Sequence, residues 1–357
     1  MKRLLTFVVL AVLCGLAVVP AALAAEPYQP PEGALKPVPL NEGAQAGFDN
    51  LKYKTGDPVR IAYMPPATEF NYYMAIGEGV KTKAAELGVE TFMLAPQSGS
   101  DIATQMKMIQ DAITQNVDAI ILSTHDEQAA APLVKQAVDK GIVVIIVNSD
   151  IPNFPTPVHG VVGYSQRRGT YKLGMFAAGM VKAKAKVGVL EGLPGYHSTE
   201  RIGGFLDAFA QFPEMEIVAS LPTAWNVETG NKAMMDLLQA HPEIEMVVTA
   251  NDYISIGAAT AAKALGREDV LNFGNDGDTA GLEDIAAGKW TGTVNTTPFV
   301  MGKVALQVAV DSLNKVYPGG WTETPVVIVN QTNAIDFLCR PENLYPKPSK
   351  EYTCPQR

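Results

Sequence analysis

The stretch MVVTANDYISIGAATAA, residues 246–262, shows how this chain is built. A short apolar run ends in small residues, Asn251 and Asp252 follow side by side, and apolar residues then recur at helical spacing. An apolar run without alternation is typical of a strand that is covered on both faces. The stretch therefore predicts a buried strand, a polar turn and a helix.

The same order of strand, turn and helix recurs along most of the chain. Strands are expected at residues 59–64, 90–95, 117–123, 142–148, 158–163, 186–192, 216–222, 244–250, 270–274, 290–295 and 325–331. Helices are expected at 72–88, 100–115, 128–141, 169–183, from about 199, and at 227–240, 254–265, 279–287 and 298–315. Helices between strands imply right-handed crossovers and parallel sheets. Because the Pro-rich segment 151–157 divides the pattern, the predicted fold class is α/β with two Rossmann-like lobes.

The two ends of the chain differ from this pattern. Lys2 and Arg3, an apolar run and the small-residue step at 22–24 predict an export signal that is cleaved after Ala24. The apolar run is shorter than the roughly 20 residues that span a bilayer. Residues 25–57 are rich in Pro, Gly and Ala without an apolar period, which predicts an extended arm.

Two cysteines remain after cleavage, Cys339 and Cys354. An even pair in an exported chain predicts a disulfide that staples the tail, residues 339–357, although two free thiols are the alternative.

Composition and motifs exclude several classes of function. The formal net charge is -9 and no Lys/Arg cluster occurs, so nucleic acid and anionic membranes are poor partners. No G-x-S-x-G, Walker or dinucleotide-binding motif follows the first strand. The four histidines lack metal-site spacing, so we expect structural or surface roles for His125 and His159. The chain is therefore predicted not to be an enzyme and to need no cofactor or metal.

Polar and aromatic side chains gather where the predicted strands end. In parallel α/β sheets, ligands bind beyond the carboxyl ends of the strands. The candidate ligand-binding residues at these positions are Tyr72, Tyr73, Asn148, Asp150, Arg201, Trp225, Asn251, Asp252, Asp276 and Thr296. Amides, carboxylates and a guanidinium can satisfy hydroxyls in pairs, and aromatic rings can cover the C–H faces of a sugar. A small polyhydroxylated ligand is therefore expected.

Several candidates also have a plainer interpretation. Tyr72 and Tyr73 could anchor the first helix, and Trp225 could belong to the core. Asp252 and Asp276 could cap the helices that follow them, and Arg201 could form a surface ion pair. These alternatives stay open at the level of sequence.

The motifs taken together resemble a known family. The paired Tyr72-Tyr73, AIILSTHDEQAAAPLVKQAVDKGIVVIIVNSD, STERIGGF, AWNVETG, TANDYISIGA and FGNDGD are similar to the ribose-binding-protein-like branch of the periplasmic sugar-binding proteins of ABC transporters, over about residues 58–337. The resemblance implies a monomer of the type 1 fold in the periplasm, with three hinge segments near 155–165, 293–297 and 324–327. It implies lobes formed by 58–160 with 297–325 and by 161–296 with 326–338.

The resemblance also implies roles for individual residues. Tyr73 and Trp225 look like the aromatics that sandwich the ligand ring, while Asn148, Arg201, Asn251 and Asp276 look like hydroxyl-binding residues. This chain departs from the ribose pattern: Asn148-Ser149 stands where that pattern has Asp-Arg, and Thr296 replaces a Gln. The resemblance therefore predicts a sugar or polyol without naming it.

The expected partner is a membrane ABC permease, and the alternative is a membrane sensor kinase or chemoreceptor. A repressor built on this fold would carry a helix-turn-helix where this chain has its export signal. A hydrolase has no catalytic motif to support it.

Overall fold

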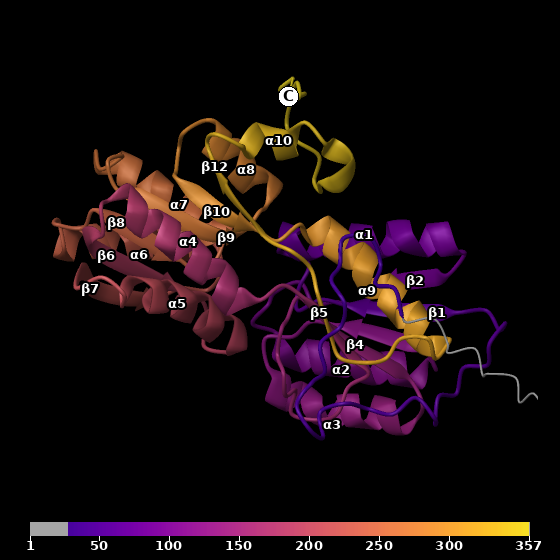
Figure 1. Cartoon of the computed structure of the whole chain (residues 1–357). Coiled ribbons are helices and arrows are strands. Elements are labelled where there is room, and N and C mark those ends of the chain that lie inside the picture. Colours follow the sequence, from indigo (N-terminus) through magenta and orange to yellow (C-terminus); the bar gives the residue numbers. More distant parts are fainter. Residues whose placement is uncertain (1–27, 357) are drawn as a thin grey trace, which may run out of the picture.

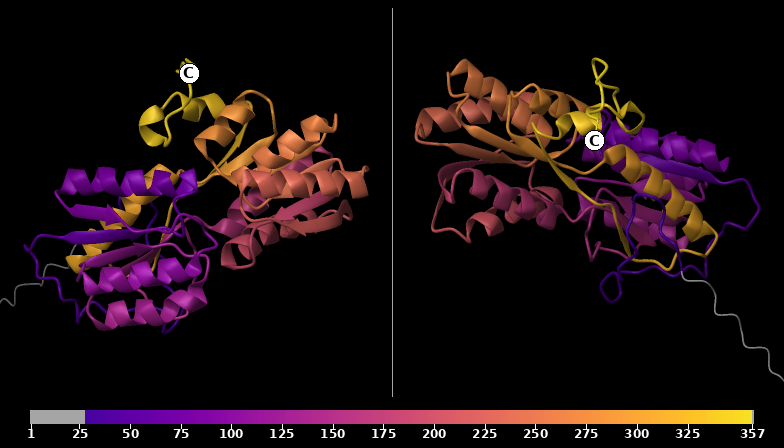
Figure 2. Two further views of the ribbon diagram at one scale, coloured as in Figure 1. Left: turned by 180° about the vertical axis from the view of Figure 1, so that it is seen from behind. Right: turned by 45° about the horizontal axis from the view of Figure 1, so that its top comes forward.

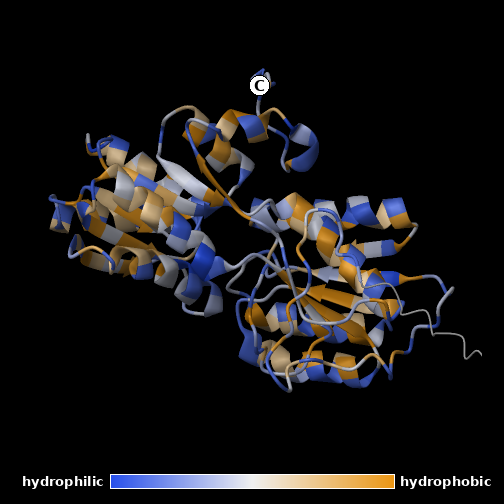
Figure 3. Ribbon diagram, in the orientation of Figure 1, coloured by the Kyte–Doolittle hydropathy of each residue, from blue (hydrophilic) through white to orange (hydrophobic). Residues whose placement is uncertain are grey.

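The computed structural model describes residues 28–356, so the predicted signal segment and its cleavage site lie outside the described residues. The chain forms two lobes that lie side by side, each built on one six-stranded sheet (Figures 1 and 2). Apolar residues concentrate on the strands and on the inner helix faces, and polar residues lie outside (Figure 3). Among the described residues, no helix is both long and apolar enough to cross a membrane.

The first lobe has an all-parallel sheet in the order β11-β5-β4-β3-β1-β2. Its strands are β1 (Arg60–Met64), β2 (Glu90–Met93), β3 (Ala119–Leu122), β4 (Val143–Val147), β5 (Gly160–Gly163) and β11 (Trp321–Glu323). Its helices are α1 (Asn71–Leu87), α2 (Ile102–Thr114), α3 (Glu127–Asp139) and α9 (Pro298–Leu313). Alternate strand residues belong to two apolar clusters: Ile61 and Tyr63 pack with α1 and α9, and Ala62 and Met64 pack with α2 and α3. Both faces are thus covered, which explains the unbroken apolar runs in the sequence.

The second lobe has a sheet in the order β12-β10-β9-β8-β6-β7. Its strands are β6 (Lys184–Glu191), β7 (Glu214–Pro222), β8 (Met246–Thr249), β9 (Leu271–Asp276), β10 (Gly292–Asn295) and β12 (Val327–Asn330). Its helices are α4 (Gln166–Met180), α5 (Tyr196–Phe209), α6 (Val227–Ala240), α7 (Asp252–Ala264), α8 (Thr279–Ala286) and α10 (Ala334–Leu338). The predicted two-lobed α/β fold is confirmed, although β12 is antiparallel to β10 at the edge.

The chain passes between the lobes three times. These passages lie between β5 and α4, between β10 and α9, and between β11 and β12 (Figure 1). The predicted lobe boundary at residue 160 is wrong, because β5 pairs with β4 and β11 and so belongs to the first sheet. The first passage therefore comes only after Gly163.

The arm packs on the first lobe, and the tail packs mainly on the second. Val38 in the arm exchanges backbone hydrogen bonds of 2.9 and 2.7 Å with Trp321, so the arm extends the edge of the first sheet at β11. The predicted disulfide between Cys339 and Cys354 is present, with an S–S distance of 2.09 Å. A short 3₁₀ helix (Pro341–Asn343) follows α10. The tail lies beside α8, where the Thr279 hydroxyl donates to the Pro346 carbonyl at 2.9 Å, and its Tyr345 borders α1 of the first lobe (Figure 2).

Candidate functional site: a cavity between the lobes

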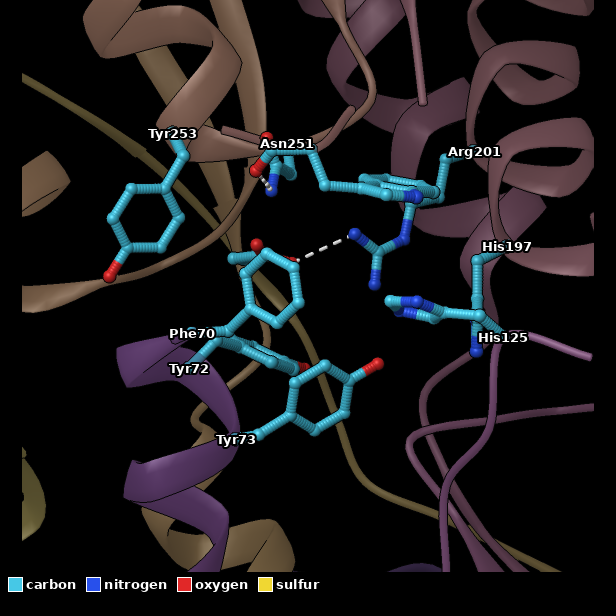
Figure 4. Close-up of a pocket in the computed structure, with 10 residues that line it drawn as sticks. Phe70, Tyr72, Tyr73, His125, His197, Arg201, Asn251 and Tyr253 are labelled. Carbon is cyan, nitrogen blue, oxygen red and sulfur yellow. Dashed lines mark hydrogen bonds and ion pairs between the residues drawn. The ribbon is translucent and has the colours of Figure 1, made fainter. Parts of the chain in front are cut away.

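The carboxyl ends of the strands of both sheets border one cavity between the lobes. Its empty space, about 340 Å³ including space open to solvent, is lined by Phe70, Tyr72, Tyr73, His125, His197, Arg201, Trp225, Asn251, Tyr253 and Asp276 (Figure 4). Six of the predicted ligand-binding residues lie in this wall: Tyr72, Tyr73, Arg201, Trp225, Asn251 and Asp276.

Tyr72 and Tyr73 enter the cavity from the first turn of α1 (Figure 4). The Tyr72 hydroxyl donates to Asn148 Oδ1 at 2.8 Å and lies 2.9 Å from Thr296 Oγ1. The Tyr73 hydroxyl accepts from Asn148 Nδ2 at 3.3 Å and from Ser123 Oγ at 3.4 Å. Because its oxygen accepts twice, the Tyr73 hydroxyl keeps its hydrogen for a further bond. Asn148 and Thr296, both predicted to bind ligand, instead lie behind the tyrosines and hold them in place.

Arg201 and Asp276 form a buried ion pair in the wall that belongs to the second lobe. Arg201 Nη1 lies 2.9 Å from Asp276 Oδ1, and each side chain is 4 % exposed. Arg201 also donates through Nε to Gln166 Oε1 at 3.0 Å and through Nη1 to the Ala250 carbonyl at 3.1 Å. Burial raises the pKa of Asp276 to about 7, although the guanidinium opposes the shift. The surface ion pair considered for Arg201 is therefore excluded.

Trp225 and Asn251 complete that wall. Trp225 has φ +65°, a left-handed backbone that is costly for a bulky residue, and its indole lies against Gly192, where a Cβ would come within 2.2 Å of Cζ2. Asn251 caps α7 by accepting from the Ile254 N–H at 2.9 Å, and it donates to the Trp225 carbonyl at 3.1 Å. Strained backbone that its surroundings hold in place is characteristic of binding sites.

Asp150 and Asp252, both predicted to bind ligand, do not line the cavity. Asp150 accepts from the Gln166 N–H at 3.1 Å and from the Tyr196 hydroxyl at 3.1 Å, so it links the first lobe to α4 and α5 of the second. Asp252 accepts from the N–H groups of Gly277 and Asp278 and from the Thr293 hydroxyl. Its carboxylate holds the loop after β9, which is a structural role.

Two histidines, His125 and His197, also line the cavity. His125 follows β3 in the first lobe and stacks on Trp225 of the second, with ring centroids 6.2 Å apart. His197 stands at the start of α5 and is 7 % exposed. His125 therefore lines the cavity and does not lie on the outer surface, and no metal group forms around it within residues 28–356. His159 does have a structural role, since its Nδ1 accepts from the Val144 N–H at 3.0 Å.

Comparison with protein families agrees with this geometry. The model of the periplasmic binding protein domain matches residues 61–315. The chain belongs to this family. Among its relatives, a D-ribose/D-allose-binding protein of Pseudomonas aeruginosa is 27 % identical over 77 % of this chain and 90 % of that protein. A ribose import binding protein of Bacillus subtilis is 29 % identical over 68 % of this chain and 78 % of that protein.

A solved structure of a relative has the same fold as this periplasmic binding protein. An ABC transporter solute-binding protein from Actinobacillus succinogenes with bound D-allose superposes with a TM-score of 0.74 at 26 % identity. The superposition covers 78 % of this chain and 100 % of that one. The two-lobed architecture predicted from the sequence is thus shared with a sugar-bound protein.

Sequence reasoning about this periplasmic binding protein missed four residues of the cavity wall: Phe70, His125, His197 and Tyr253. Three of them stand within four positions of a predicted site residue, namely Phe70 beside Tyr72, His197 beside Arg201, and Tyr253 beside Asp252. Closeness in sequence to a predicted site residue could therefore have identified these three. His125 had a weaker signal, its place three residues after Leu122, where the apolar run of β3 ends.

Proposed function

We propose that this protein captures a small polyhydroxylated ligand, a sugar or a polyol, between its lobes and delivers it to an ABC permease. The observation that carries the proposal is the Arg201–Asp276 pair set among aromatic rings in the interlobe cavity. The names of the relatives, which include binding proteins for ribose, allose and apiose, support the ligand class.

The ion pair leaves one donor and one acceptor free. Arg201 Nη2 and Asp276 Oδ2 have no hydrogen-bond partner within residues 28–356. A hydroxyl donates and accepts at once, so two adjacent hydroxyls can bind to this pair of atoms. The faces of Tyr73 and Trp225 can then cover C–H groups of the ligand ring.

Closure of the lobes would couple binding to delivery. The wall includes Tyr72, Tyr73 and His125 from the first lobe and Arg201 and Asp276 from the second. A ligand that contacts both lobes binds the closed form better than the open form and so shifts the population toward closure. The proposed site of action is the periplasm, reached after cleavage behind Ala24, and the proposed role is binding by a monomer without catalysis.

The test is a thermal-shift screen of the chain beginning at Ala25 against pentoses, hexoses, cyclic and linear polyols, sugar acids and small amines. A ligand at a thousandfold its Kd adds about 4 kcal/mol of stability, which a melting curve resolves. We expect a shift with at least one neutral polyhydroxy compound, abolished in Asp276→Asn. The matched control is Asp139→Asn, which alters an exposed pair with Lys135 on α3 and should keep the full shift. A shift with amines alone would contradict the proposal.

A membrane sensor kinase or chemoreceptor is the second candidate partner. The allose-bound relative aligns over its whole length while covering 78 % of this chain, so this protein carries additional segments that offer extra surface. Deletion of the gene distinguishes the two roles. Loss of ligand uptake supports delivery to a permease, whereas normal uptake with loss of a transcriptional or chemotactic response supports sensing.

A further inference from the structure

Two imidazole rings, one from each lobe, line the cavity beside Arg201 (Figure 4). His125 Nδ1 lies 3.2 Å from the carbonyl oxygen of Gly99 in the first lobe. His197 Nδ1 lies 3.0 Å from Oε1 of Gln166 in the second lobe. Each ring thus makes its hydrogen bond to the protein through Nδ1, and its Nε2 is left for another contact.

The hydrogen bonds determine which nitrogen of each ring carries the hydrogen. A carbonyl oxygen can only accept, so His125 Nδ1 must donate to Gly99. The orientation of the Gln166 amide follows from Arg201, which can only donate and lies 3.0 Å from Oε1. The atom that faces His197 Nδ1 is therefore an oxygen, and this ring also carries its hydrogen on Nδ1.

Both rings are neutral at pH 7. Burial lowers the pKa of His125 to about 4, and burial together with the charge of Arg201 lowers the pKa of His197 well below its usual value. The charged or titratable groups that act on the two rings are Arg201, Glu69 and the rings themselves. Each Nε2 is then a bare lone pair, and neither has a partner in the part of the chain that the structure describes.

We propose that His125 and His197 determine ligand specificity by accepting hydrogen bonds from ligand hydroxyls through their two Nε2 atoms. This inference rests on the proposed function and deepens it. Because one acceptor belongs to each lobe, a ligand that donates to both is held by hydrogen bonds from both sides of the cleft. The histidines therefore favour a ligand whose hydroxyls can donate to both Nε2 atoms. Such a ligand also stabilises the closed arrangement of the lobes.

The surrounding charges favour an uncharged ligand. The charge of Arg201 is already matched by Asp276 at 2.9 Å, and a ligand carboxylate would face the lone pairs of two neutral imidazoles. Two bare imidazoles can also bind a transition metal. However, within residues 28–356 no group of three His, Cys, Asp or Glu side chains is arranged to hold a metal ion, and the guanidinium of Arg201 lies beside both rings. A neutral polyol with several hydroxyls remains the ligand that fits.

Paired substitutions separate the role of Nε2 from that of Nδ1. Asn places an amide nitrogen near the position of Nδ1, so His125→Asn and His197→Asn keep the structural hydrogen bond and lose the acceptor. Gln places an amide oxygen near the position of Nε2, so His125→Gln and His197→Gln keep an acceptor. His241→Asn is the control, because His241 contacts Glu243 away from the cavity.

Affinity is measured by calorimetry with D-ribose, D-allose and myo-inositol, and with deoxyfluoro analogues of each compound that binds. We expect each Asn variant to bind about tenfold more weakly, the usual effect of losing one hydrogen bond to a buried acceptor, and each Gln variant to stay closer to the parent. Fluorine cannot donate a hydrogen bond, so the analogue that lacks the relevant hydroxyl should bind the parent more weakly than the unmodified ligand does. The matching Asn variant has already lost the acceptor, so it should bind this analogue and the unmodified ligand with similar affinity. Equal binding by parent and Asn variants overturns the inference and leaves the proposed function intact.

A ligand-free measurement tests the same inference independently. Long-range ¹H–¹⁵N correlation spectra at pH 7 report the tautomer of each histidine. We expect the Nδ1–H form for His125 and His197, and an Nε2–H form at either position overturns the inference whatever the ligand. A larger thermal shift with Zn²⁺ than with any polyol would also overturn it, and binding of no sugar or polyol would remove the proposed function itself.

Discussion

Replacing Arg201 by Met tests the electrostatics of the cavity directly. The change leaves Asp276 buried without its cation, and it removes the hydrogen bonds to Gln166 and Ala250. Breaking a buried ion pair by removing one partner costs about 3–5 kcal/mol. Both side chains are 4 % exposed, so solvent screens the pair little, and we expect Arg201→Met to fall within this range at pH 8.

The destabilisation caused by Arg201→Met should increase as pH rises. Burial raises the folded-state pKa of Asp276 to about 7, above its unfolded value, so its carboxyl favours folding at low pH and this contribution is lost as pH rises through about 7. Removing the Arg201 charge raises this pKa further. Near pH 5 the carboxyl is neutral in both proteins, and only lost packing and hydrogen bonds distinguish them. The difference therefore grows only as pH rises through about 7, by at most about 1.4 kcal/mol per unit, because one proton is involved.

Urea denaturation of the ligand-free proteins at pH 5, 6, 7 and 8 measures these free energies of unfolding. The double variant Arg201→Met/Asp276→Leu removes both charges and should recover most of the stability, because a buried pair can be replaced by apolar residues at little cost. A destabilisation by Arg201→Met that is the same at pH 5 and pH 8 would refute the argument. It would mean that the charge of Asp276 does not depend on Arg201.

Two further substitutions test the geometry. Gly192→Ala places a Cβ 2.2 Å from Cζ2 of Trp225, so the indole must move; we expect ligand affinity to fall at least about fivefold by calorimetry, since overpacking costs about 1–3 kcal/mol. Gly179→Ala is its control: Gly179 has open space around it, and ligand affinity should not change. Tyr196→Phe removes the interlobe hydrogen bond to Asp150 and should weaken ligand binding about threefold, since one hydrogen bond contributes about 0.5–1.5 kcal/mol; unchanged affinity would exclude Asp150 from closure.

The sequence predicted the secondary structure well because most strands are covered on both faces. Residues of β1, β3 and β4 alternate between two apolar clusters, so the runs contain no polar positions and differ clearly from the amphipathic helices. The pattern of apolar residues could not predict which of the two lobes contains β5. Its residues, 160–163, are small and apolar and would fit either sheet, and its second partner, β11, lies more than 150 residues further along the chain.

The site was predicted less completely than the fold, for a geometric reason. Sequence locates strand ends, but it does not give the direction of each side chain there. Asn251 and Asp252 are neighbours, yet Asn251 lines the cavity and Asp252 turns inward to the loop at Gly277. His125 and His197 belong to different lobes and meet only at the cavity between them. Motif spacing along one segment cannot detect such a pair.

The polar atoms left free in the cavity wall indicate which hydrogen-bonding groups the ligand must carry. The list of wall residues alone does not show this. Asn148 and Thr296 are engaged with Tyr72, and Asn251 is engaged with α7 and with Trp225, so little of their hydrogen-bonding capacity remains. Within residues 28–356, the free groups of the wall include Nη2 of Arg201 and the Tyr73 hydroxyl hydrogen as donors, and Oδ2 of Asp276 and two imidazole Nε2 atoms as acceptors. A carboxylate would satisfy only the donors, and an ammonium group only the acceptors. Hydroxyls satisfy both kinds, so the hydrogen-bonding of the wall favours a neutral polyol even where this chain lacks the residues of the ribose pattern.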